Sequence, residues 1–127
     1  MANRVATILG IGFLLVGILG FVMPGLLGAH LSLAHNIIHL VTGAVSLWIG
    51  LKGTVSAARN FCIIFGVVYL LLGVAGFVLG TGADRMFVVI AGQLELGTMD
   101  HIIHIVLGGV YLVGGLMTSS VGTARTA

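Results

Sequence analysis

The chain contains four mostly apolar runs, each long enough to cross a lipid bilayer, and this feature restricts its fold more than any other. A spanning helix needs about 20 such residues. Only 6% of the 127 residues are charged, whereas a soluble domain has about 25%. So few charges could not cover a water-exposed surface, so we expect an integral membrane protein. The expected spans are residues 5–23, 32–51, 61–79 and 100–117.

The first and second runs have counterparts later in the chain. Residues of the first recur 56 positions later in the third, and residues of the second recur 65 positions later in the fourth. We therefore expect one domain, residues 1–127, built from two tandem helical hairpins, about 5–51 and 61–117. Parallel hairpins imply a pseudo-twofold axis along the membrane normal, and the predicted fold is an all-α, up-down bundle of four transmembrane helices. The matched pairs are Gly10 and Gly66, Gly17 and Gly73, Gly20 and Gly76, Phe21 and Phe77, His39 and His104, Gly43 and Gly108, and Gly50 and Gly115.

The glycines and aromatic residues predict how the helices pack. Spacings of three and seven residues place the glycines roughly on one helix face, where small residues let transmembrane helices approach closely. Trp48, Tyr69 and Tyr111 are candidate interfacial anchors, although they show no clear aromatic belt. Residues 86–96 are apolar but too short to span, which fits either an interfacial or re-entrant piece or an ordered loop. The glycines expected at packed faces are Gly17, Gly20, Gly43, Gly73, Gly76 and Gly108.

A short polar motif opens the second span and recurs at the start of the fourth, as HNIIH from position 35 and DHIIH from position 100. Polar groups in an apolar setting need a partner or a function. Residues four apart share a helix face, so His35 lies beside His39, and Asp100 beside His104. The two spans are diagonal in an up-down bundle, so His39 and His104 are expected to approach each other. The candidate polar cluster is His35, Asn36, His39, Asp100, His101 and His104.

This cluster has three interpretations. In the first it is a structural clasp, in which Asp100 caps the fourth helix and the other members hydrogen-bond between helices. In the second, His35, His39, Asp100 and His104 bind a divalent metal such as Zn²⁺, or His39 and His104 are paired ligands of a b-type haem. In the third, the histidines respond to external pH, although no chain of acidic groups continues across the membrane.

Other residues give weaker signals. We interpret His30 as a solvated loop residue and Cys62 as a small buried thiol, which cannot form an intramolecular disulfide because it is the single cysteine. The chain has no GxSxG, no Cys/His pairing and no phosphate-binding loop, so we expect no catalytic residues and no enzyme. The basic pI rests on five Lys and Arg residues and does not indicate a nucleic-acid partner.

The paired motifs, each following a glycine-rich helix, resemble the bacterial four-helix membrane family known as domain of unknown function 4383. The resemblance covers about residues 5–117 and includes a third span that reads GVVYLLLGVAG from position 66. It implies an integral bacterial membrane protein without an established activity. His101 stands where the family pattern has an Asn-like residue. The matching positions are His35, Asn36, His39, Gly43, Asp100, His104 and Gly108.

These observations together predict a small non-enzymatic membrane protein, an interaction or accessory component with the cluster as its clasp. The alternative is a metal- or haem-binding membrane protein. The expected partners are the lipid bilayer and other membrane proteins or further copies of the chain, and the primary expectation includes no cofactor.

The basic residues predict the orientation. Arg4, Lys52, Arg59 and Arg125 fall on one side of the membrane and Arg85 on the other. By the positive-inside rule, both termini are cytoplasmic and the polar motifs face outwards, in a bacterial plasma membrane. The first span also resembles a signal peptide, but its match to the third favours its retention.

Cysteine labelling tests this orientation. A membrane-impermeant maleimide added to intact cells should leave Lys52→Cys unlabelled and should label Arg85→Cys, because the two positions are predicted on opposite sides. Lys52→Cys should react only after the cells are opened. External labelling of Lys52→Cys would contradict the orientation.

Overall fold

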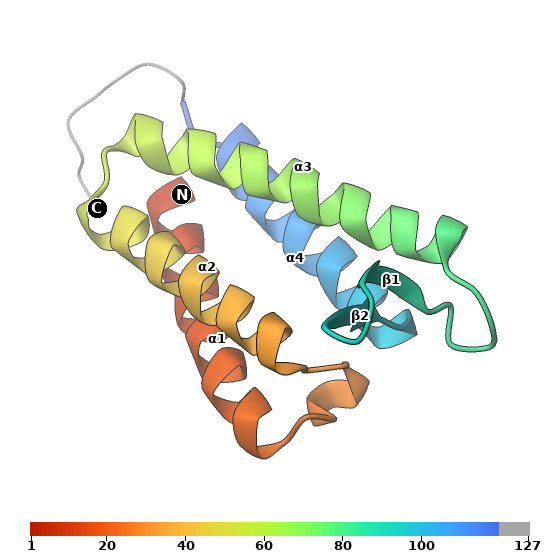
Figure 1. Ribbon diagram of the computed structural model, residues 1–127. Coiled ribbons are helices and arrows are strands. Elements are labelled where there is room, and N and C mark those ends of the chain that lie inside the picture. Colours follow the sequence, from red (N-terminus) through yellow and green to blue (C-terminus); the bar gives the residue numbers. More distant parts are fainter. Residues whose placement is uncertain (120–127) are drawn as a thin grey trace.

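The computed structural model describes residues 1–119 (Figure 1). Its long helices are α1 (Ala2–Val22), α2 (Leu33–Lys52), α3 (Val55–Leu79) and α4 (Thr98–Leu116). A short 3₁₀ helix, η1 (Leu26–Gly28), lies between α1 and α2, and strands β1 (Phe87–Ile90) and β2 (Leu94–Leu96) lie between α3 and α4. Arg125, which was counted for the orientation, lies outside the described residues.

The predicted spans and fold class are confirmed. Within residues 1–119, four helices are long and apolar enough to cross a membrane. Helix α3 begins earlier than expected, at Val55, because the Thr54 side chain accepts a hydrogen bond from the N–H of Ala57 (3.0 Å). Large apolar side chains cover the outward faces, for example Val22, Trp48 and Val78, which are 67–78% exposed. Such surfaces require lipid.

The helices form two hairpins, each made of two antiparallel helices. Helix α1 packs along α2, and α3 packs along α4, while the hairpins meet mainly through α1 against α3 and α4. The two hairpins lie close at the end that holds the N-terminus and diverge towards the end that holds the β strands (Figure 1). At the close end, the Ala2 N–H donates to Thr118 Oγ1 (2.9 Å), and the buried Cys62 thiol donates to the Ala2 carbonyl (3.6 Å).

Glycines bring the helix backbones of each hairpin into direct contact. A Cβ atom added at Gly43 would lie 2.8 Å from the Leu14 nitrogen and 2.9 Å from the Gly10 oxygen. At Gly108 it would lie 2.6 Å from the Leu70 nitrogen, and it would also meet the backbone of Gly66 (2.8 Å). These contacts correspond at the same 56- and 65-residue offsets that the sequence shows. The duplication itself stays a prediction.

Tyr69 and Tyr111 are not interfacial anchors, as the sequence had suggested. They are 6% and 0% exposed and lie within the bundle, where Phe13 stacks on both rings at centroid distances of 5.6 and 6.3 Å. The Tyr111 hydroxyl lies 2.9 Å from Ser46 Oγ, which itself donates to the Ala6 carbonyl (2.7 Å). A buried hydroxyl needs such a partner, so this bond allows a tyrosine at the centre of the bundle.

Residues 86–96 contain a β hairpin, whereas the sequence predicted an interfacial or re-entrant piece or an ordered loop. Strands β1 and β2 pair antiparallel, with Phe87 opposite Leu96 and Val88 opposite Glu95. The run of Val88, Val89 and Ile90 favours a strand because β-branched residues suit extended backbone. Gly92, with a φ of 72°, lies in the connecting turn. The hairpin contacts α3 through β1 and α4 through β2.

Adjacent glycines on α4 provide a test of the packing. Gly108→Ala should lower the free energy of unfolding in detergent by about 1–3 kcal/mol, because the new methyl group overlaps the α3 backbone. Gly109→Ala is the matched control, since a Cβ there meets nothing within 4 Å and alanine favours a helix by about 1 kcal/mol. Equal effects of the two substitutions in thermal unfolding would contradict the packing.

Candidate functional site

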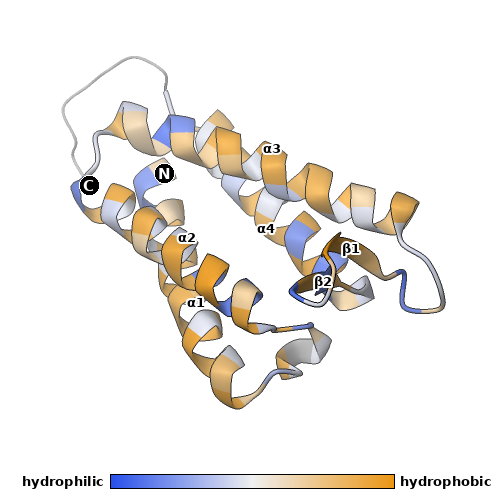
Figure 2. Cartoon of the chain, viewed as in Figure 1, coloured by the Kyte–Doolittle hydropathy of each residue, from blue (hydrophilic) through white to orange (hydrophobic). Residues whose placement is uncertain are grey.

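The sequence-predicted polar residues gather at the diverging end of the bundle, where α2 and α4 begin. Figure 2 shows hydrophilic residues at the starts of these helices within otherwise hydrophobic spans. Ser32 caps the start of α2, and its side-chain oxygen accepts the His35 N–H (3.2 Å). Asp100, in the first turn of α4, accepts the Gly97 N–H through Oδ2 (2.8 Å). Its carboxylate therefore lies at the positive end of the helix dipole.

Three histidines from the two hairpins meet between the helices. His35 and His39 come from α2, His104 comes from α4, and one ring nitrogen of each lies within 4.8 Å of the others. Their exposed fractions are 3%, 7% and 4%. The His35 ring centroid is 4.3 Å from that of His39 and 6.1 Å from that of His104. We call these residues the three-histidine group.

Aromatic side chains enclose the three-histidine group on the side of the bundle core. The Phe13 ring packs on His39 at a centroid distance of 5.3 Å, and Tyr69 packs on His104 at 5.5 Å. Phe13 and Tyr69 stand 56 positions apart, as equivalent residues of the two hairpins. These rings close the core side of the group, and Nδ1 of His39 and Nδ1 of His104 have no hydrogen-bond partner.

Asp100 is buried (2% exposed) beside the three-histidine group but bonds to a different histidine. Its Oδ2 lies 2.9 Å from His30 Nδ1, and the His30 backbone N–H lies 3.2 Å from both carboxylate oxygens. His30 Nε2 also lies 3.5 Å from the carboxylate of Asp84. His30 is thus a bridging residue with two acidic partners, and its interpretation as a solvated loop residue is incomplete.

The His30 carbonyl continues this chain of hydrogen bonds to His35. It lies 2.8 Å from His35 Nδ1. A carbonyl oxygen can only accept, so Nδ1 carries the hydrogen atom and Nε2 of His35 keeps its lone pair. The path from Asp100 through His30 to His35 therefore connects α4 to the first hairpin and sets the tautomer of a member of the three-histidine group.

Asn36 and His101 belong to the predicted cluster but point elsewhere. Asn36 packs on Gly20 of α1, and His101 packs on Gly76 of α3, so closely that a Cβ on either glycine would overlap the side chain. The Nε2–H of His101 donates to the Arg85 carbonyl (2.7 Å). Each side chain thus faces the glycine helix of its own hairpin and not the three-histidine group.

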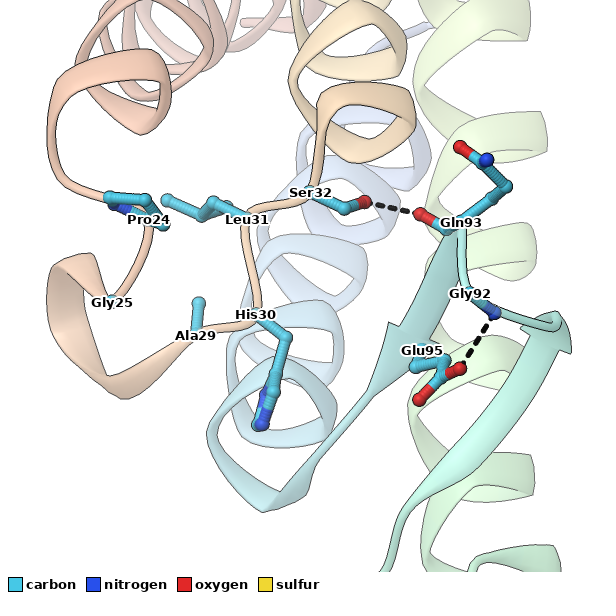
Figure 3. A pocket seen from close by; sticks show the side chains of 9 residues that line it. All are labelled: Pro24, Gly25, Ala29, His30, Leu31, Ser32, Gly92, Gln93 and Glu95. Carbon is cyan, nitrogen blue, oxygen red and sulfur yellow. Dashed lines mark hydrogen bonds between the residues drawn. The ribbon is translucent and has the colours of Figure 1, made fainter.

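The connection between α1 and α2 also contacts the turn between β1 and β2, close to the three-histidine group. Ser32 Oγ donates to the Gln93 carbonyl in the β turn, and the Glu95 carboxylate accepts the Gly92 N–H (2.8 Å) (Figure 3). Beside these contacts lies an open hollow of about 530 Å³, whose lining includes Pro24 and His30. Two small cavities of about 50 Å³ each lie against the three-histidine group itself.

Four apolar helices with a buried polar cluster at one end define a small multi-pass membrane protein. The chain belongs to the family described as Domain of unknown function (DUF4383), whose family model matches residues 3–117. This confirms the resemblance drawn from the paired histidine motifs. No curated protein matches the chain, and no solved structure does.

Proposed function

We propose that this chain is a non-enzymatic accessory or interaction component of a bacterial plasma membrane, with both termini in the cytoplasm. In this proposal the polar residues at the outer end hold the two hairpins together. We call the bonds of His30 with Asp100 and His35 the clasp. The proposed partners of the chain are other membrane proteins or further copies of itself.

The observation that carries the proposal is the bond between His30 and Asp100. His30 lies in the first hairpin and Asp100 in the second, and three hydrogen-bond contacts of 2.9–3.2 Å join them. The hairpins diverge towards this end (Figure 1), so bonds that join them here oppose their further separation. A bond across the gap then limits how far the hairpins can separate.

The energetic argument rests on the burial of Asp100. Hydrogen bonds between membrane helices contribute only about 0.6 kcal/mol on average. A buried group left without its partner costs more, about 1–3 kcal/mol. Asp100 is 2% exposed, so separating the hairpins without hydrating this carboxylate would be unfavourable. The clasp therefore favours one arrangement of the hairpins more strongly than an exposed pair would.

Only a small part of the chain lies outside the four spans, and this supports the non-enzymatic role. In residues 1–119 this part consists of the short connections and the β1–β2 hairpin. The hollow of about 530 Å³ beside them is open, whereas catalytic sites usually exclude water. A role in holding or meeting other helices requires no enclosed site.

A double-mutant cycle tests the clasp. Asp100→Asn keeps an acceptor for the Gly97 N–H but removes the charge that faces His30, and His30→Gln removes the imidazole. Each single substitution should lower the free energy of unfolding in detergent by about 1–3 kcal/mol. The double variant should lose less than the sum, with a coupling energy of at least about 0.5 kcal/mol.

Glu95→Gln is the matched control, because this carboxylate accepts a hydrogen bond within the β turn and does not connect the two helical hairpins. It should leave the stability within about 0.5 kcal/mol of the wild type. Strictly additive losses in the Asp100 and His30 variants would refute the clasp.

A further inference from the structure

The clasp leaves part of the site without a role. It uses Asp100, His30 and Nδ1 of His35. Nδ1 of His39 and Nδ1 of His104 are fully buried and have no hydrogen-bond partner. Unpaired buried polar atoms are costly, and native structures rarely keep them without a reason.

We propose that His35, His39 and His104 bind one divalent transition-metal ion of the kind that imidazole ligands favour, with Zn²⁺ as the first candidate. Imidazole suits Zn, Cu and Ni ions, whereas Mg²⁺ and Ca²⁺ prefer oxygen ligands. Three protein ligands with an open fourth position are a known arrangement for zinc. This site goes beyond the clasp and rests on different atoms.

The separation of the ring nitrogens fits such an ion. With Zn–N bonds of 2.0–2.1 Å, tetrahedral ligand nitrogens lie about 3.4 Å apart. Here one nitrogen of each histidine lies within 4.8 Å of the others. Small ring rotations would close the difference, and the adjoining cavities of about 50 Å³ give the rings and a fourth, water-sized ligand the necessary space.

The same cavities argue against haem between His39 and His104. Sites for cofactors and other small molecules measure about 300–1,000 Å³, and each cavity against these histidines measures about 50 Å³. Phe13 and Tyr69 also occupy the space beside the imidazoles. A single ion is the ligand that fits.

The surroundings of His35 prepare it as a ligand. Its Nδ1–H donates to the His30 carbonyl, which leaves Nε2 as the metal-binding atom, and such outer bonds typically orient metal-binding histidines. Asp100 lines the same cavity as the three histidines, so its negative charge favours a cation there. Both its oxygen atoms accept hydrogen bonds from His30 or Gly97, and Asp100 is not among the residues whose ligand atoms all lie within 4.8 Å of one another. In this proposal Asp100 is therefore a neighbour of the ion and not its fourth ligand.

Packing alone does not explain three imidazoles at one place. His39 and His104 are equivalent positions of the two hairpins, so a duplication would account for both. His35 corresponds to Asp100, and its bond to the His30 carbonyl uses Nδ1 alone, which leaves its second ring nitrogen without a role in the clasp. An aromatic ring such as that of Phe13 would fill the same space without leaving nitrogen atoms unpaired.

The experiment uses the full chain, purified in detergent through a tag without histidine and stripped of metal with a chelator. Co²⁺ is added as the optical probe, because its visible bands report nitrogen ligands and coordination number. Wild type should bind about one Co²⁺ per chain, and Zn²⁺ should displace it. Zn²⁺ should also raise the melting temperature, since a ligand that binds only the folded state stabilises it.

Variants locate the site. His39→Gln and His104→Gln keep a polar side chain of similar size and should weaken binding by more than about 100-fold, beyond the effect of losing an outer-shell contact. His101→Gln is the matched control, because this histidine is equally buried but lies outside the group. It should bind as the wild type does. Asp100→Asn should weaken binding by about 10–100-fold without abolishing it.

Two results would overturn the proposal. One is a folded wild-type chain that binds neither Co²⁺, Zn²⁺, Cu²⁺ nor Ni²⁺ in stoichiometric amount, a result that needs no variant to fold. The other is unchanged binding in the His39→Gln, His104→Gln double variant. Neither result affects the coupling between Asp100 and His30, so the clasp and the metal site fail separately.

Discussion

The direct contact between helix backbones inside each hairpin is the constraint on which the rest of the structure depends. Gly43 lies against the backbone of α1, and Gly108 lies against the backbone of α3. In a bilayer the hydrophobic effect does not drive helices together, so close van der Waals packing of this kind has to do so. The glycines also fix the register of each pair of helices. The large apolar side chains are then left on the outside, facing lipid.

The order of the helices has a consequence for the polar residues. Because the chain runs up and down, α2 and α4 begin at the same end of the bundle, and the histidine side chains in their first turns are buried there. His35, His39 and His104 meet there, and Phe13 and Tyr69 close the space on the core side. Electrostatic interactions are strong in such surroundings, for satisfied and unsatisfied groups alike. The placement of each hydrogen bond therefore matters more here than on a wetted surface.

The sequence predicted the features that depend on periodicity. Apolar length located the four spans, and glycine spacing pointed to positions such as Gly43 and Gly108. The four-residue spacing placed His35 beside His39, and the symmetry of an up-down bundle predicted that His39 and His104 would approach each other.

Features that depend on the path of a loop could not be predicted in this way. His30 belongs to no periodic pattern, and its bond to Asp100 exists because the connection between α1 and α2 returns over the start of α4. The sequence does not show this bond, and its four-residue spacing placed Asp100 beside His104. The β hairpin was missed because residues 86–96 were judged by length, while the β-branched Val88, Val89 and Ile90 carried the strand signal.

Some of the hydrogen bonds between the two hairpins join equivalent positions that carry different residues. Ser46 and Tyr111 stand 65 positions apart, and their hydroxyl groups bond to each other. His35 and Asp100 are related in the same way, and His30 connects them. Two aspartates at these positions would repel each other, and two tyrosines at the centre would exceed the space available. Two similar hairpins gain specific contacts where equivalent positions carry complementary residues. Interactions between the two halves therefore arise at such differences and at the paired His39 and His104, while the matched glycines build each half.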